Sequence, residues 1–224
     1  MTVIEPTRKD ILHSEKTKKY SSSLRFWHWA NTIIISGSLI TVLINSTITD
    51  RWATSSLISD ELKKAGATVT NDQAGQAAHA LEDKVWAIHT YFGYCLAALL
   101  LLRLILEFFQ VTDQKLIRKL KGAWFQYKVI KKNRETARHE LAVKMIYVAF
   151  YLLLIIMALT GLTLAFKHEL GIPRPIGHQI QDIHGFCMYL VLAFIAVHLI
   201  GVFLAERRDS KGIVSDMING GNAN

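Results

Sequence analysis

Cysteine is scarce in this sequence. The chain of 224 residues has two, Cys95 and Cys187, and both fall inside apolar stretches. A disulfide framework is therefore not expected, and the cysteine sets that hold iron–sulfur clusters or zinc are lacking. The CxxCH motif that attaches haem covalently is also missing. We interpret both cysteines as small packing residues, and any metal ion in this protein must then be held by histidine.

Charge is also missing over long stretches. No charged residue occurs from Trp27 through Thr49, and the hydrophobic residues, 51% of the chain, are clustered rather than spread. A membrane-crossing helix needs roughly 20 apolar residues. Four stretches reach that length, at about 26–46, 85–109, 143–166 and 183–205. The sequence thus predicts an all-α fold, a transmembrane four-helix bundle.

Basic residues predict the orientation, because lysine and arginine close to the spans are held on the cytoplasmic side. The N-terminal arm, the 110–138 loop and the tail together carry eighteen of them, whereas the two other loops carry six. Both termini are therefore expected in the cytoplasm. The formal charge of +8 then fits contact with anionic lipid headgroups, and nucleic-acid binding is not expected.

The chain is expected to contain one membrane domain and no internal repeat. Its parts are a cytoplasmic N-terminal arm, a four-span membrane domain and a cytoplasmic tail, at residues 1–25, 26–206 and 207–224. The membrane domain would include a long outer loop at 47–84 and the basic cytoplasmic loop at 110–138. Two portions of the outer loop, 62–65 and 73–81, are rich in good helix formers and could form short helices. The arm is polar and charged, unlike a cleavable signal peptide, so the first span is expected to be retained.

Four histidines lie in or at the ends of the apolar stretches: His28, His89, His184 and His198. A titratable side chain at membrane depth is costly, so each marks a candidate functional site. His184 and His198 are fourteen residues apart. On an α-helix this step is nearly four turns and about 21 Å, so both side chains face one side at different depths. Each histidine then needs a partner at its own depth.

The predicted topology supplies these partners. With both termini in the cytoplasm, His28 at the start of the first span and His198 near the end of the fourth lie close to the inner face. His89 and His184 lie close to the outer face. Two imidazoles close both axial positions of a haem iron, which favours electron transfer over binding of oxygen or substrate. We therefore predict an inner haem held by His28 and His198 and an outer haem held by His89 and His184.

Other interpretations stay open. A single intramembrane histidine can equally be a hydrogen-bonded structural residue or a proton relay, and a haem-free transporter or proton channel is an alternative for the whole set. Polar groups that could serve a quinone or a proton path lie at the cytoplasmic end: Arg25, Asn31, Arg103 and Glu107. Arg103 and Glu107, four residues apart, could equally form an ion pair within their helix. No role is assigned to the remaining histidines, His13, His79, His139, His168 and His178.

Several motifs accompany the histidines. The first two spans carry Arg25-Phe26-Trp27-His28-Trp29 and then Ile88-His89, Gly93 and Arg103. The third and fourth carry Thr160-Gly161, Asp182-Ile183-His184, the step to His198, Glu206-Arg207 and the tail Met217-Ile218-Asn219-Gly220. Together these motifs, which cover nearly the whole chain, resemble the b-type cytochrome subunit of nickel–iron hydrogenases and related bacterial di-haem membrane cytochromes. The tail motif most suggests the hydrogenase branch.

The resemblance implies an electron-transfer subunit that anchors an oxidoreductase, rather than a stand-alone catalyst. It implies two haem b groups on His28, His89, His184 and His198, although members of the family differ in whether both haems are present. Electrons would pass between an iron–sulfur or hydrogenase-type subunit on the outer face and menaquinone or ubiquinone. Alternatives are a free-standing di-haem oxidoreductase that serves a small diffusible molecule, or the membrane subunit of a formate dehydrogenase-like or thiosulfate reductase-like complex. A homo-oligomer is left open.

Overall fold

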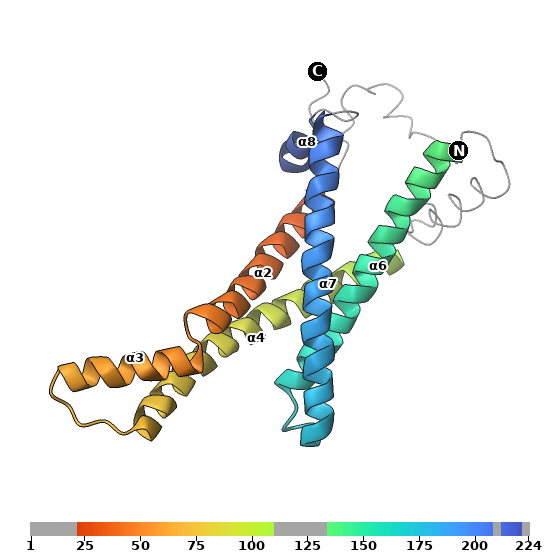
Figure 1. Cartoon of the computed structure of the whole chain (residues 1–224). Coiled ribbons are helices and arrows are strands. Elements are labelled where there is room, and N and C mark those ends of the chain that lie inside the picture. The colour runs from red at the N-terminus through yellow and green to blue at the C-terminus, as the bar shows by residue number, and fades with distance from the viewer. Residues whose placement is uncertain (1–21, 110–133, 208–211, 221–224) are drawn as a thin grey trace. The chain divides into compact units, whose positions relative to one another are not determined.

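The computed structural model describes residues 22–109, 134–207 and 212–220. They form six α-helices (Figure 1), which are α2 (Ser22–Thr47), α3 (Arg51–Lys64), α4 (Asn71–Phe109), α6 (Arg134–Ala165), α7 (Arg174–Arg207) and α8 (Ile213–Asn219). No strand occurs in the three described ranges. The all-α prediction is therefore confirmed.

Four of the described helices, α2, α4, α6 and α7, are long and apolar enough to cross a membrane. Large apolar side chains are exposed along them, for example Phe186 at 63% and Leu199 at 61%. Continuous exposed apolar surface is unfavourable in water but suits hydrocarbon, where a helix also satisfies its own backbone hydrogen bonds. The chain is therefore a multi-pass membrane protein with the four spans that the sequence predicts, while the cytoplasmic placement of its termini stays a prediction.

The helix α4 begins well before the predicted second span because a capping box starts it. The backbone N–H of Thr70 donates to Gln73 Oε1 at 3.0 Å, and the backbone N–H of Gln73 donates to Thr70 Oγ1 at 3.2 Å. The start of α3 is capped by Asp50, whose Oδ1 accepts from the backbone N–H of Ala53 at 3.1 Å. Much of the predicted outer loop is therefore helical, and its 73–81 portion belongs to α4 rather than to a separate helix.

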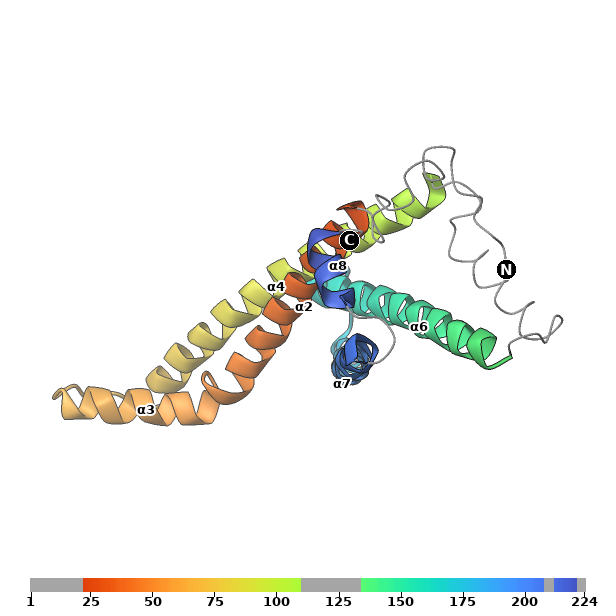
Figure 2. The same ribbon diagram turned by 90° about the horizontal axis from the view of Figure 1, so that it is seen from above.

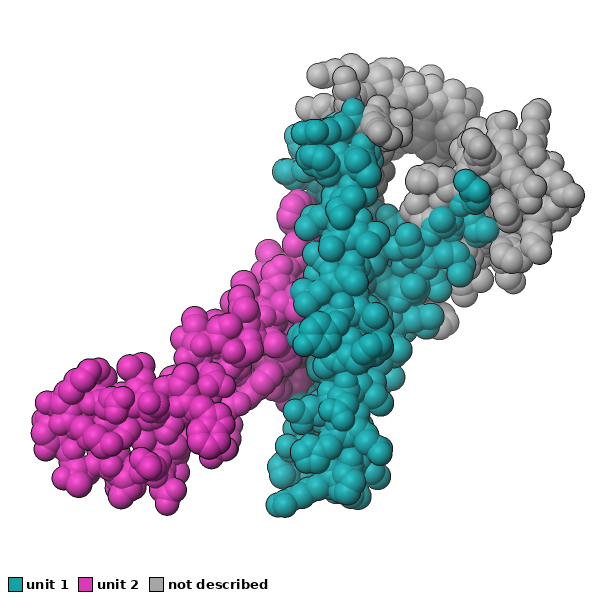
Figure 3. All heavy atoms as spheres, viewed as in Figure 1, with its two compact units in different colours: residues 1–28, 99–224 teal, residues 29–98 magenta. Residues whose placement is uncertain are grey.

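The chain divides into two compact units, unit 1 (residues 1–28 and 99–224) and unit 2 (residues 29–98), shown in Figure 3. In unit 2, small residues pack where α3 lies beside the start of α4. Ala74 and Ala78 are fully buried, and a Cβ added at Gly75 would lie 3.9 Å from Ser55 Oγ. Small side chains let two helix backbones approach closely.

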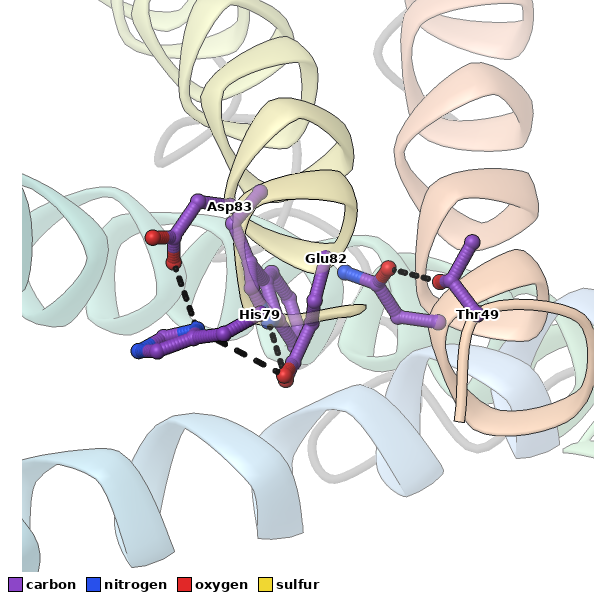
Figure 4. Close-up of polar contacts among 6 residues, drawn as sticks. Thr49, His79, Glu82 and Asp83 are labelled. Carbon is purple, nitrogen blue, oxygen red and sulfur yellow. Dashed lines mark hydrogen bonds and ion pairs between the residues drawn. The ribbon is translucent and has the colours of Figure 1, made fainter. Parts of the chain in front are cut away.

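Polar contacts in unit 2 account for one of the histidines without an assigned role (Figure 4). The Nδ1 atom of exposed His79 lies 3.4 Å from a carboxylate oxygen of Asp83 and 3.9 Å from one of Glu82, all on α4. His79 therefore belongs to a surface cluster with two acidic side chains of its own helix. A separate polar contact lies near the end of α2, where the hydroxyl of Thr49 donates to Asn45 Oδ1 at 2.5 Å and both residues are buried.

In unit 1, α6 and α8 both contact α7. Figure 2, which views α7 nearly end-on, shows α6 steeply inclined to it. Leu154 of α6 is fully buried, and Cys187 and Val191, one turn apart on α7, are buried as well. Cys187 is a free thiol in this packed region, which supports the packing role predicted for it, whereas Cys95 is a free and exposed thiol.

The C-terminal helix α8 is held at both ends. At its start, the carboxylate of Glu206 accepts from the backbone N–H groups of Gly212 at 2.8 Å and Val214 at 3.3 Å. At its end, Arg25 Nη1 donates to the carbonyl oxygen of Ile218 at 2.8 Å. The Arg-Phe-Trp-His-Trp motif and the tail motif are therefore joined by a direct hydrogen bond.

Candidate haem-binding site

All four predicted ligands are on membrane-crossing helices: His28 on α2, His89 on α4, and both His184 and His198 on α7. Each is partly buried. His28, His184 and His198 belong to unit 1, whereas His89 belongs to unit 2. The inner pair thus lies within one unit, where the structure brings its two rings together. The outer pair is divided between the units and stays a prediction.

The separation of His28 and His198 suits a metal ion between them. Their ring centroids are 6.3 Å apart, and the ring planes make an angle of 52°. An imidazole nitrogen binds a metal ion at about 2.0–2.1 Å, and the ring centre lies roughly 1.1 Å behind that nitrogen, so trans ligands of one ion have centroids about 6.3 Å apart. Two rings joined by a direct hydrogen bond would have centroids only about 5 Å apart. The observed separation therefore leaves room for a metal ion between the two rings, although the rings of Tyr91 and Tyr94, which hold no metal ion, are equally far apart.

Aromatic packing holds the plane of the His198 ring. Phe194, one turn earlier on α7, is inclined to that ring by only 6°, with centroids 5.9 Å apart. Phe150 of α6 stacks on Phe194, with centroids 4.0 Å apart and an interplanar angle of 14°. Such aromatic contacts stabilise one rotamer of each ring. A fixed ring plane is what an axial ligand requires.

His184 lies against the Thr160-Gly161 pair of α6. Thr160 Oγ1 is 2.8 Å from His184 Nδ1. A Cβ added at Gly161 would lie 3.2 Å from His184 Cε1, which is closer than about nine in ten real contacts of this kind. One residue of the pair thus holds the imidazole, and the other leaves room for it.

The surroundings of His89 are similar but lie in unit 2. Thr41 Oγ1 is 2.9 Å from His89 Nδ1, and the hydroxyl and carbonyl oxygens of Ser38 are each 3.3 Å from it. The ring of Trp86, one turn earlier on α4, meets the imidazole edge-on with centroids 5.3 Å apart. His89 is therefore oriented by oxygen atoms of α2 on its Nδ1 side.

Open space accompanies two of the ligands. Gly93 lies one turn after His89 on α4, and Gly201 lies one turn after His198 on α7, so each glycine shares a face with its histidine. A Cβ added at either glycine would meet nothing within 4 Å. A macrocycle bound by the histidine needs such room along the helix. Imidazole is a donor that haem iron accepts, so the proximity of His28 and His198 is compatible with a haem between them.

Arg103, one of the predicted quinone or proton residues, belongs to a cluster of unit 1. Its Nε donates to the hydroxyl of Tyr151 at 3.2 Å, and its guanidinium lies 6.0 Å from the centre of the Trp27 ring. Trp27 and Tyr151 stack with centroids 5.7 Å apart. The side chain of Glu107 lies outside the described part of the structure, so its ion pair with Arg103 stays a prediction.

The other two predicted polar residues lie elsewhere. Arg25 holds the tail, as described, and also donates to Ser22 Oγ at 3.3 Å, while Asn31 is buried at 5% exposure. A role for Arg25 and Asn31 in binding a quinone or moving its protons stays a prediction. Of the histidines without a role, His168 and His178 are exposed, and His13 and the side chain of His139 lie outside the described residues.

Several groups around the histidines were not predicted from the sequence: Ser38, Thr41, Phe150, Tyr151 and Phe194. Thr160 was recognised only as part of a motif. A hydroxyl group in an apolar span is a weak signal for such a contact, because it can also bond within its own helix. The contacts of Phe150, Tyr151 and Phe194 could not be predicted either, because aromatic residues are common in membrane spans whether or not they pack near a ligand.

Comparison with known proteins agrees with this geometry. A family model described as prokaryotic cytochrome b561 matches residues 19–220, a range that contains all four histidines and the tail motif. No curated protein and no solved structure matches the chain. Three findings lead to one assignment: the membrane-crossing helices, the proximity of the His28 and His198 rings and the family match over nearly the full length. The chain belongs to the prokaryotic cytochrome b561 family of haem-b-binding membrane proteins.

Proposed function

We propose that this chain is a membrane-anchoring di-haem cytochrome b that transfers electrons between a redox partner on the outer face and the quinone pool. Haem b, when bound, supplies reversible one-electron chemistry. The observation that carries the proposal is the 6.3 Å separation of the His28 and His198 rings. His28 and His198 would hold the haem as a pair of imidazole ligands, and such a pair suits electron transfer rather than catalysis at the metal.

The ligand levels on α7 support transfer across the membrane. His28 and His198 would hold the inner haem, and His89 and His184 the outer one. The fourteen residues from His184 to His198 correspond to about 21 Å along α7, a large part of the roughly 30 Å hydrocarbon core. Ligands at these two levels would connect the two faces of the membrane.

The quinone would react at the inner end, where Arg103 lies. Arginine stays charged at all physiological pH values, and the contacts with Tyr151 and Trp27 hold its guanidinium in place. A fixed positive charge stabilises a quinone oxygen that gains negative charge on reduction. We propose menaquinone or ubiquinone as the substrate, with Arg25, Asn31 and Glu107 as further polar groups of that end.

Reduced protein is expected to be reoxidised by quinone. The purified chain would be reduced with just enough dithionite and mixed with a soluble ubiquinone or menaquinone analogue, while the b-type absorption bands are followed. Because the inner haem would be the exit site, His198→Ala is expected to slow reoxidation strongly. Equal rates in the wild type and this variant would contradict quinone reaction at the inner end.

The redox partner is expected to co-purify. We propose a subunit of the iron–sulfur or hydrogenase type on the outer face, so mild solubilisation of native membranes and identification of companion chains would recover such a subunit. Isolation of the chain alone, with undiminished electron transfer from a small diffusible donor to quinone, would instead favour a free-standing oxidoreductase.

The proposed topology, in a bacterial inner membrane with both termini in the cytoplasm, predicts the behaviour of reporter fusions. A fluorescent protein at either terminus is expected to fluoresce, and alkaline phosphatase inserted between α3 and α4 is expected to be active, because the phosphatase needs the oxidising outer side. Phosphatase activity at the C-terminus would reverse the assignment of inner and outer haems.

A further inference from the structure

We propose that Thr41 and Thr160 are positioning residues that fix the proton of His89 and His184 on Nδ1 and thereby tune the haem that these histidines bind. The inference rests on the proposed function, which makes both histidines axial ligands. The threonines lie on α2 and α6, yet they make the same contact, with Oγ1···Nδ1 distances of 2.9 Å and 2.8 Å.

The hydroxyl group of Thr160 donates its proton to a backbone carbonyl within α6. Thr160 Oγ1 donates to the carbonyl oxygen of Ile156, four residues earlier, at 2.7 Å. A hydroxyl group has one proton and two lone pairs. Met157 offers the same hydroxyl a second carbonyl oxygen at 3.3 Å. With the hydroxyl proton directed to these carbonyls, the oxygen of Thr160 accepts from His184, and the proposal therefore assigns the hydrogen to Nδ1. A neutral imidazole in this tautomer has its lone pair on Nε2.

The hydroxyl of Thr41 is used in the same way. Thr41 Oγ1 donates to the carbonyl oxygen of Ser38, three residues earlier, at 2.6 Å. That carbonyl oxygen, which can only accept, is also 3.3 Å from His89 Nδ1. Both oxygens favour a hydrogen on Nδ1, and the lone pair of His89 is again on Nε2. Thr41 is itself buried, at 5% exposure, so its hydroxyl orientation is held by the protein rather than by solvent.

This arrangement has two consequences for a bound haem. It presents Nε2, the nitrogen that would hold the iron, in a single tautomer and ring orientation. An acceptor on Nδ1–H also makes the imidazole a stronger electron donor, which stabilises ferric over ferrous iron and lowers the reduction potential. Because the proposed function places His89 and His184 on the outer haem, both threonines would act on that haem and not on the inner one.

The test compares Thr41→Val and Thr160→Val with the matched variants Thr41→Ser and Thr160→Ser. Valine keeps the shape but removes the acceptor, whereas serine keeps the hydroxyl. Redox titration of the purified holoprotein would resolve two haem components, and the one absent in His184→Ala identifies the outer haem. Each valine variant is expected to shift the outer haem toward the reduced form by about tenfold, which is about 59 mV for one electron. The inner haem serves as internal reference, and the serine variants are expected to behave as the wild type.

The outcomes separate this inference from the proposed function. If His89→Ala and His184→Ala retain both haems, the ligand assignment is wrong. If they lose the outer haem while the valine variants keep its wild-type potential, the ligand assignment holds and the role of the threonines is wrong. Equal shifts of both haems in the valine variants would indicate a general structural disturbance and would also overturn the role. Should Thr41→Val fail to fold, Thr160→Val and its serine control decide the question alone.

Discussion

Replacing His198 by alanine is expected to remove the inner haem and to leave most of the outer one. The reason is geometric: His198 faces His28 at 6.3 Å between ring centroids, so its loss leaves one axial ligand where the account requires two. Replacing His184 is expected to do the reverse. In each variant, haem content per chain should fall from about two to about one, because a bis-histidine site binds poorly with one ligand missing. The pyridine haemochrome assay and redox titration of the purified variants measure this result.

The same helix provides a matched control for these variants. His178 is an exposed histidine on α7, and His178→Ala is expected to retain both haems at their wild-type potentials. Equal loss of both haems in His198→Ala and His184→Ala would show that the two levels on α7 are not independent sites.

Replacing Gly161 by valine is expected to eliminate most of the outer haem without touching the inner one. A Cβ at this position would already lie 3.2 Å from His184 Cε1, and the two methyl groups of valine, held by a restricted χ1, add further bulk against the ring. The imidazole must then turn away from its ligating orientation. Disturbing the groups that orient a metal ligand typically costs about 10- to 100-fold in affinity. Gly161→Ala is expected to give a partial loss, since the ring must yield by only a few tenths of an ångström.

The control for the glycine is again on α7. A Cβ at Gly177 would meet nothing within 4 Å, so Gly177→Val tests whether added bulk at a membrane-helix glycine matters in general. Both haems should be retained there. Loss of the inner haem in Gly161→Val, at wild-type helical content, would contradict the assignment of His184 to a separate outer site.

The spans and the proximity of His28 to His198 were predictable because they depend on coarse properties of the chain. A helix must be about 20 residues long to cross the bilayer, and the fourteen-residue step between His184 and His198 implies two depths whatever the details of packing. The partnership of His28 with His198 then followed from the number of crossings. Neither prediction depends on the rotamer of a side chain.

The hydroxyl contacts were not predictable for a physical reason. Serine and threonine are common in apolar helices, and each can donate to a carbonyl of its own helix. Whether Thr41 or Thr160 also meets a histidine depends on the rotation and register of two helices. Because apolar side chains surround these spans on several sides, the hydrophobic pattern specifies neither the rotation of a helix about its axis nor its register against a neighbouring helix. The contact of Arg25 with Ile218 could not be predicted either, because the two residues are 193 positions apart in the chain and no local pattern connects them.

The ratio of haem to protein in the purified wild-type chain, measured together with its electron paramagnetic resonance spectrum, tests the central claim most directly. Four imidazoles arranged as two axial pairs predict about two protohaem groups per chain, both six-coordinate and low-spin in the ferric state. A chain that folds and retains its helices but binds no haem, or that carries only five-coordinate high-spin haem, would contradict the account.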